Sequence, residues 1–378
     1  MKSFRFNSLF ILICLSYQFS CIEHFQFEGK NEYPALIVEG YVSDVSSNDF
    51  KKMYHKSRNF YVKLKYSGTV TNTLDEKITG AEVELMSNSG ESWDYTEDYS
   101  EPGTYYLYYP DFKASPNTAY KVNIKLENGD EFESEYDEVP YDNVRAEIGQ
   151  KEVTEFQYEV VSSETAIKPI PGLNVNAQLP TLIDSDFRYF RWDFDVTWKL
   201  VAEFSYPSSP TGVCWIGDMY YLDDYVLAKN MGEFPSVDLF FLQTSGNREI
   251  KFGFAAIIRQ QEISRNHYQF WEDLRNQEKQ ADLFAPPPYN IYTNLKSKNS
   301  ENPVFGFFGA IDEEYYTWYF DKKSLSYAPI DLEECFVLPN HEPAPWCSDC
   351  MKYATGRTGG RLTKGETITT EKPSWWTF

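Results

Sequence analysis

The chain has 378 residues, and its 57 acidic and 35 basic residues give a formal net charge of -22 at pH 7. This charge repels phosphate backbones, so nucleic acid is excluded as a favoured partner. Aromatic residues reach 17%, a composition that favours pleated sheets over helical bundles. We expect a mainly β protein whose acidic surface serves solubility, the alternative being an acidic face that attracts cationic cargo.

The first residues are typical of an export signal. After a basic start, residues 9–15 form an apolar stretch that is too short for a membrane span of roughly 20 apolar residues. Ser20 and then Cys21 follow, as lipoprotein processing requires. We therefore expect residues 1–20 to be a lipoprotein signal peptide and Cys21 to carry the lipid. A secreted protein with Cys21 as an ordinary thiol is the alternative.

The lipid determines where the protein is held. Several acyl chains on Cys21 would anchor it durably in a bilayer. Residues 21–34 are then a tether, and Glu23 is a weak indication of transport to the outer face of the cell. We expect a lipid-anchored protein of the cell outer membrane that faces outward.

Residues 35–139 are predicted to form an immunoglobulin-like or prealbumin-like β-sandwich. Apolar and polar side chains alternate in residues 60–66 and again in residues 120–126, the period of two expected for a sheet with one buried face. The pair Asn128-Gly129 follows and readily adopts the positive φ angles of a tight hairpin turn.

Residues 140–378 are predicted to form a second β-rich domain. Apolar side chains alternate along residues 190–200, and a further strand is expected at residues 250–258. The opposite face of the first of these strands carries Arg191, Asp193, Asp195 and Lys199. We interpret the acidic residues of that face as a solvated surface rather than a site of paired carboxylates.

One helix is expected at about residues 264–281. Ser264 can cap its free amides, and the prolines 286–288 lie beyond its end. Its apolar stripe contains Tyr268, Trp271 and Leu274. Such a stripe normally packs against a sheet, and we interpret His267 beside it as a packing residue rather than a general base.

Four cysteines remain once Cys14 leaves with the signal and Cys21 takes the lipid. They are Cys214, Cys335, Cys347 and Cys350. An even number outside the cytoplasm predicts two disulfides, which four cysteines can form in three ways. We expect Cys214 to pair with one of the other three and to staple an irregular C-terminal segment to the strand region.

Two other interpretations of these cysteines stay open. Cys335, His341, Cys347 and Cys350 have the side chains and spacing of a tetrahedral zinc site. Alternatively, Cys347 and Cys350 form a redox-active C-x-x-C pair, although the surrounding βαβ pattern of such sites is missing. Oxidising conditions favour the disulfides, so no metal and no cofactor is expected.

Catalytic motifs are scarce in the sequence. Four histidines are present, and the chain lacks a G-x-S-x-G elbow, an H-E-x-x-H helix and a Walker-type glycine loop. Two of the 57 carboxylates could still form a glycosidase pair without any local signature. The sequence therefore favours a protein that is not an enzyme.

The order of several short segments resembles a Bacteroidetes lipoprotein family known as the domain of unknown function 4249 family. The matching pieces are Cys21, residues 36–40, 80–83, 189–192, 214–215, the helix with Tyr268, Phe270 and Trp271, residues 286–288, 306–308, the C-x-x-C pair and Gly359-Gly360. The resemblance implies an accessory of TonB-dependent outer-membrane transporters with no enzymatic activity, and it names no ligand.

Three classes of function follow. The first is a non-enzymatic partner of a TonB-dependent transporter that captures cargo or covers the extracellular mouth. The second is an adhesive or envelope-structural lipoprotein without a small ligand, and the third is a carbohydrate-active or redox enzyme. Co-purification with a barrel protein would separate the first class from the second.

Overall fold

The computed structural model describes residues 34–67, 76–140, 144–161, 164–180, 187–219, 221–222, 225–230, 236–279, 291–330, 335–336, 342–353 and 366–377. The predicted signal peptide, the lipidation site Cys21, His341, the prolines 286–288 and Gly359-Gly360 lie outside these residues. Within them the fold is mainly β, as the composition predicted. No helix of the described part is long and apolar enough to cross a membrane.

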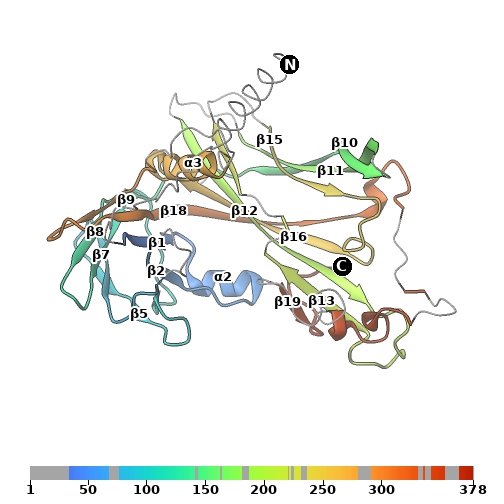
Figure 1. Ribbon diagram of the computed structural model, residues 1–378, viewed down its shortest axis with the longest axis horizontal. Coiled ribbons are helices and arrows are strands. Elements are labelled where there is room, and N and C mark those ends of the chain that lie inside the picture. The colour runs from blue at the N-terminus through green and yellow to red at the C-terminus, as the bar shows by residue number, and fades with distance from the viewer. Residues whose placement is uncertain are drawn as a thin grey trace, which may run out of the picture.

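The described strands form three sheets (Figure 1). The long sheet has the order β19 (Glu366–Thr369), β13 (Val213–Asp218), β12 (Arg188–Val201), β16 (Phe254–Ile263), β18 (Val304–Tyr319), β1 (Leu36–Ser43), β2 (Phe60–Tyr66), β6 (Thr104–Leu107) and β5 (Thr96–Glu97), and β14 (Val226–Asn230) pairs with β12. A second sheet has the order β17 (Leu295–Ser297), β8 (Glu131–Ser134), β7 (Ala119–Lys125), β3 (Glu82–Ser87) and β4 (Ser92–Asp94), and β9 (Asp137–Glu138) pairs with β7. The third contains β10 (Glu147–Val161), β11 (Glu164–Gln178) and β15 (Ser236–Gln243).

The first core lies between the second sheet and the β1–β2 end of the long sheet. Alternate side chains of the strands fill it, among them Val38, Val62, Leu85 and Val122, all at most 1% exposed. The predicted hairpin joins β7 to β8, and Gly129 in its turn has a φ of 89°. The alternating segments of the first 139 residues therefore form strands of a sandwich, as their period predicted.

This sandwich is completed by strands from the other end of the chain. β1 pairs in parallel with the first half of β18, with Leu36 opposite Val304, and β8 pairs with β17. Figure 1 shows β18 running across the molecule from these strands to β16 and β12. The predicted domain limits of 35–139 and 140–378 therefore do not coincide with two separately closed sheets, because strand pairing at long sequence separation leaves no local pattern.

The second core lies between the other end of the long sheet and the third sheet. β12 follows the predicted alternation, and Phe190, Trp192, Val196 and Trp198 are buried. The strand expected at residues 250–258 begins later, at Phe254, and runs on to Ile263. A turn in which the Lys251 amide donates to the Arg248 carbonyl precedes it, followed by Gly253 with a φ of 134°.

Two α-helices lie in the described residues. α3 (Arg265–Lys279) begins as predicted after Ser264, whose Oγ accepts a hydrogen bond from the His267 amide at 3.1 Å. The other helix, α2 (Ser47–Tyr54), was not predicted, and Ser46 caps it by accepting a hydrogen bond from the Asp49 amide. Its eight residues are too few for a clear period of 3.6.

The C-terminal segment docks on the second core, as expected for an irregular tail. It contains the 3-10 turns η1 (Lys322–Ser324), η2 (Pro345–Cys347) and η3 (Cys350–Lys352), and β19 pairs with β13. Near its end Trp376 is 3% exposed, and Tyr319 donates a hydrogen bond to the Trp375 carbonyl at 2.6 Å.

Candidate binding site

A cavity of about 530 Å³ lies between α3 and the face of the long sheet that points away from both cores. Its walls come from β1, β2, β12, β16, β18 and α3. It thus lies where the first and last parts of the chain meet in one sheet, and ligand sites occur preferentially where separate structural units meet. This volume is ordinary for a small-molecule site.

Arg191, Asp193 and Arg259 lie at the floor, and the Arg58–Glu313 ion pair lies behind them. We call these five residues the charged cluster. Glu313 is its centre, with a fully buried side chain. One of its carboxylate oxygens accepts hydrogen bonds from Arg259, and the other accepts from Arg58 and from the Ser43 hydroxyl. Burial alone would raise the pKa of Glu313, but Arg259 and Arg58 outweigh it and lower the pKa to about 2. Glu313 is therefore an anionic anchor and not an acid catalyst.

Asp193 connects Arg191, the third arginine of the charged cluster, to Arg259. Its Oδ2 accepts a hydrogen bond from Arg191 at 2.7 Å and another from Gln261, and it lies 3.5 Å from Arg259. Arg191 and Arg259 are therefore held side by side on neighbouring strands. Such a frame fixes guanidinium groups in place before any ligand arrives.

Aromatic rings cover the faces of all three guanidinium groups. The Trp271 ring of α3 lies 4.0 Å from the Arg191 guanidinium, and the Tyr41 ring lies 4.7 Å from that of Arg259. On the far side of the charged cluster, the Phe50 ring of α2 lies 5.0 Å from that of Arg58. Cation–π contacts of this kind favour arginines that have lost part of their water.

A second hollow of about 560 Å³ adjoins the cavity and is also lined by Arg191, Asp193 and Arg259. It extends towards α2 and contains the ion pair of Lys56 with Asp195 at 2.7 Å. The charged cluster is therefore a partition between two hollows, of which the one under α3 has the more apolar walls.

His267 on α3 lies over the sheet as a packing residue, in agreement with the sequence analysis. Its ring stacks on Phe307, with centroids 4.5 Å apart, and a Cβ added to Gly309 would come within 2.4 Å of it. Burial, together with the positive charges of Arg191 and Arg259, lowers the pKa of His267 to about 3. The ring is therefore neutral at pH 7 and binds a proton too weakly for a general base.

The interpretation of the acidic residues on the outer face of β12 as solvated holds for Asp195 but not fully for Asp193, whose side chain is 29% exposed. Arg191 and Asp193 lie under α3 and the surrounding aromatic rings, and the Arg191 side chain is only 13% exposed. Asp195 further along is 38% exposed, in line with the expectation. Alternation shows which side chains leave the core, but it does not show what covers the other face.

The four predicted cysteines form two disulfides, Cys214–Cys350 and Cys335–Cys347. Cys214 thus pairs with one of the C-terminal three, as expected. The zinc interpretation is wrong for Cys335, Cys347 and Cys350 because all three are in disulfides and have no free thiolate. The redox interpretation is wrong because Cys347 and Cys350 are bonded to other cysteines and not to each other. No described group of three or more His, Cys, Asp or Glu residues has metal-site geometry.

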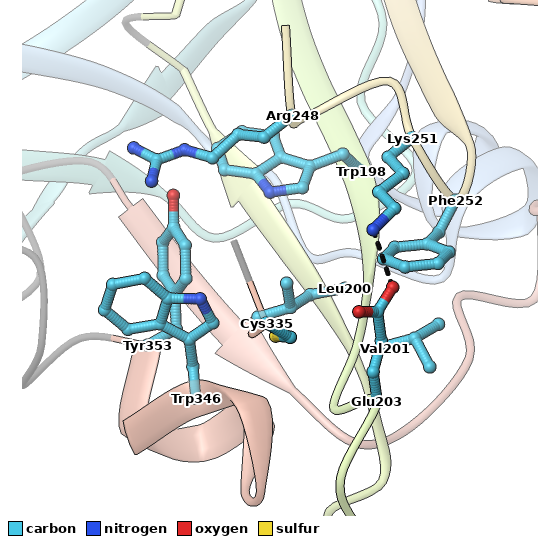
Figure 2. A pocket seen from close by; sticks show the side chains of 10 residues that line it. All are labelled: Trp198, Leu200, Val201, Glu203, Arg248, Lys251, Phe252, Cys335, Trp346 and Tyr353. Atoms are coloured by element: carbon cyan, nitrogen blue, oxygen red, sulfur yellow. Dashed lines mark hydrogen bonds and ion pairs between the residues drawn. The ribbon is translucent and has the colours of Figure 1, made fainter. Parts of the chain in front are cut away.

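A small hollow of about 30 Å³ lies beside Cys335, between Trp198, Trp346 and Tyr353 (Figure 2). An ion pair of Lys251 with Glu203 at 2.6 Å borders it. This volume equals about one water molecule, so the disulfide region offers no room for a ligand here.

Sequence reasoning missed three members of the charged cluster, Arg58, Arg259 and Glu313. Arg259 follows the apolar residues 254–258 of β16, and Glu313 stands in the acidic run 312–314 in the middle of the otherwise mostly apolar β18. A charge inside a predicted strand is the one signal that could have indicated them. Arg58 precedes β2 in an irregular segment and carries no such signal. Their meeting depends on the pairing of β16 with β18, which joins distant parts of the chain.

The family model described as "Domain of unknown function (DUF4249)" matches residues 22–317. This range contains the whole charged cluster and α3, and it excludes Cys335, Cys347 and Cys350. No curated protein and no solved structure matches the chain. Because the match covers more than half of the sequence, the chain belongs to the DUF4249 family.

Proposed function

We propose that this protein is a lipid-anchored, non-enzymatic binding protein of the outer membrane that serves a TonB-dependent transporter by capturing its cargo. The anchor would be Cys21, outside the described residues. The extracellular face is the side on which such a role operates. Covering the mouth of the transporter is the second form that this role could take.

The observation that carries the proposal is the cavity under α3. It combines about 530 Å³ of space, apolar walls and arginines held in place by carboxylates. Two titratable groups at or behind its floor do not suit acid catalysis, since His267 stays neutral and Glu313 stays ionised around pH 7. A fixed polar floor under apolar walls is the arrangement of a site that binds and orients a small molecule.

The test is affinity purification of the tagged, lipidated protein from mildly solubilised envelopes, followed by mass spectrometry. We expect a TonB-dependent barrel in stoichiometric amount. A Cys21→Ala variant should lose its acyl chains and its place in the membrane fraction. Absence of a barrel from repeated preparations of the lipidated protein would contradict the transporter role.

One observation favours an adhesive or envelope-structural role as the second candidate. β10 and β11 form a long hairpin at the edge of the molecule (Figure 1). Phe156, Tyr158 and Ile167 on it are 67%, 77% and 61% exposed. Exposed apolar patches often mark contact surfaces. Replacing these three residues with serine should abolish binding to cells in an adhesin and leave recovery of a barrel unchanged.

A further inference from the structure

The floor of the cavity under α3 carries more positive than negative charge. The charged cluster holds three guanidinium groups and two carboxylates, all in mutual ion pairs. The other charged residues among the described ones that line the cavity are Lys65 and Glu39, one of each sign. The described residues at the cavity thus carry one more positive than negative charge, in a chain whose net charge is -22. The general acidity of the protein would favour cations, so this local excess is specific to the cavity.

Burial makes this excess costly without a further anion. The Arg191 side chain is 13% exposed, and within the described part of the chain its Nε has no hydrogen-bond partner. Burial lowers the pKa of Arg191, and the nearby Asp193 offsets this only in part. A guanidinium group in such surroundings gains from each additional charge-assisted hydrogen bond.

Two further polar side-chain atoms at the cavity are buried without a partner among the described residues. These are Nε1 of Trp271 and Nδ1 of His267, a residue that is 6% exposed. Buried polar groups are nearly always hydrogen-bonded in proteins, so a cluster of unpaired ones calls for a ligand or water. Arg191, Trp271 and His267 all line the same cavity.

The upper walls of the cavity are flat and apolar. Phe270 packs against Phe307 with centroids 5.5 Å apart, and Tyr41 meets Tyr61 at 5.9 Å. Phe305 also lines the cavity and is 48% exposed. Rings of this kind stack on planar apolar groups.

Resting on the binding role proposed above, we propose that this cavity takes a small aromatic monocarboxylate, with its carboxylate at the charged cluster beside Arg191 and its flat apolar body between the aromatic walls under α3. A guanidinium fork matches the two oxygens of a carboxylate. A single excess charge fits one carboxylate and does not fit a polyphosphate. The same excess opposes a cationic cargo.

The experiment titrates the full-length, detergent-solubilised protein with three probes of equal size by calorimetry. 2-Naphthoate carries a carboxylate, 2-naphthamide is neutral and 2-naphthylmethylamine is cationic. We expect the naphthoate to bind at least about tenfold more tightly than the amide and the amine not to bind. Equal binding of naphthoate and amide, or no binding of naphthoate up to its solubility limit, would overturn the inference.

Variants then locate the site. Arg191→Gln should weaken naphthoate binding by about tenfold or more. Arg145→Gln is the control, because it removes the same charge from a side chain that is 70% exposed and pairs with Glu314. This control should leave naphthoate affinity unchanged. At the half-exposed Phe305, substitution by Glu should weaken binding more than substitution by Gln, since the two differ only in charge. If Arg191→Gln binds naphthoate with full affinity, the carboxylate does not bind beside Arg191. Equal affinities in the two Phe305 variants would likewise show that it binds outside this cavity.

The two experiments distinguish failure of the ligand class from failure of the transporter role. Recovery of a barrel with a protein that ignores naphthoate would overturn the ligand class and leave the transporter role standing. Naphthoate binding that depends on Arg191, without any barrel in the purification, would overturn the transporter role and keep the site.

Discussion

Glu313 links parts of the chain that are far apart in sequence. Its side chain is fully buried and pairs with Arg58, which precedes β2, and with Arg259 of β16. Removing one member of a buried ion pair is far more destabilising than the pair is stabilising, because the partners are left charged and desolvated. The stability of the whole charged cluster therefore depends on this one carboxylate.

We expect Glu313→Gln to lower the free energy of unfolding by about 3–5 kcal/mol, since two buried guanidinium groups lose their shared anion. The neighbouring Glu314→Gln is the matched control. Glu314 pairs with the largely exposed Arg145, and such pairs contribute about 0–1 kcal/mol. Urea unfolding followed by tryptophan fluorescence measures both. Equal losses in the two variants would show that Glu313 does not hold the charged cluster together.

Asp312, the residue before Glu313, has the opposite behaviour. Burial, with the negative charges of Asp44 and Glu262, raises the pKa of Asp312 to about 8. Glu262 stands directly opposite it on β16. The folded protein therefore binds a proton here that the unfolded chain releases near the ordinary aspartate pKa of 3.8.

This shift predicts how stability depends on pH. A raised carboxyl pKa gives stability that is complete below the unfolded value and is lost as pH rises through the folded value. We expect the melting temperature to fall between about pH 4 and pH 8. Asp312→Asn, which cannot ionise, should flatten this fall and should stabilise the protein at pH 8. Scanning calorimetry across this range is the measurement, and parallel pH profiles of variant and parent would contradict the assignment.

At the scale of elements, the parallel contact of β1 with β18 determines the shape of the site. Gly306 of β18 allows it, with a φ of 114°, because a Cβ at this position would lie 1.8 Å from the Val38 carbonyl oxygen. No side chain other than hydrogen fits between the two strands here. Phe305 and Phe307 on either side line the cavity.

Gly306→Ala should therefore separate β1 from β18 and destabilise the fold severely. Gly129→Ala is the matched control, since Gly129 also has a positive φ, of 89°, but nothing lies within 4 Å of an added Cβ. Backbone strain alone costs about 1–2 kcal/mol. We expect Gly129→Ala to lose about that much in urea unfolding and Gly306→Ala clearly more, with loss of naphthoate binding. Similar losses would mean that the clash is relieved by movement of β1.

The alternation of side chains predicted β2, β7, β12 and part of β16, but it did not predict the long strands β10, β11 and β18. In β12 it identified the buried face from Phe190 to Trp198, because one side of that strand faces a core and the other does not. It was less informative in β16, where nine of ten residues are buried and the period of two disappears. What covers the outer face, α3 and the tyrosines of β1 and β2, comes from distant sequence and leaves no local trace.

For the molecule as a whole, the sequence predicted local elements and the number of disulfides better than it predicted which distant segments pair. The four cysteines pointed to two disulfides, and the pairing of Cys214 with Cys350 follows from the docking of the tail beside β13. Cysteines 136 residues apart in the sequence come together only when the complete fold forms. The same is true of β18, whose first half belongs to the first core and whose second half belongs to the second.

The shared strand predicts that residues 34–140 do not fold alone. Without β17 and β18 the strands β1 and β8 would have open edges, and the first core would lose Leu295, Phe308 and Ala310. We expect this fragment to lack cooperative urea unfolding. The same fragment joined through a flexible glycine-serine linker to residues 291–312 should regain it, because β17 and the part of β18 that pairs with β1 return. Cooperative unfolding of the short fragment would instead establish a self-sufficient N-terminal domain, as the sequence analysis expected.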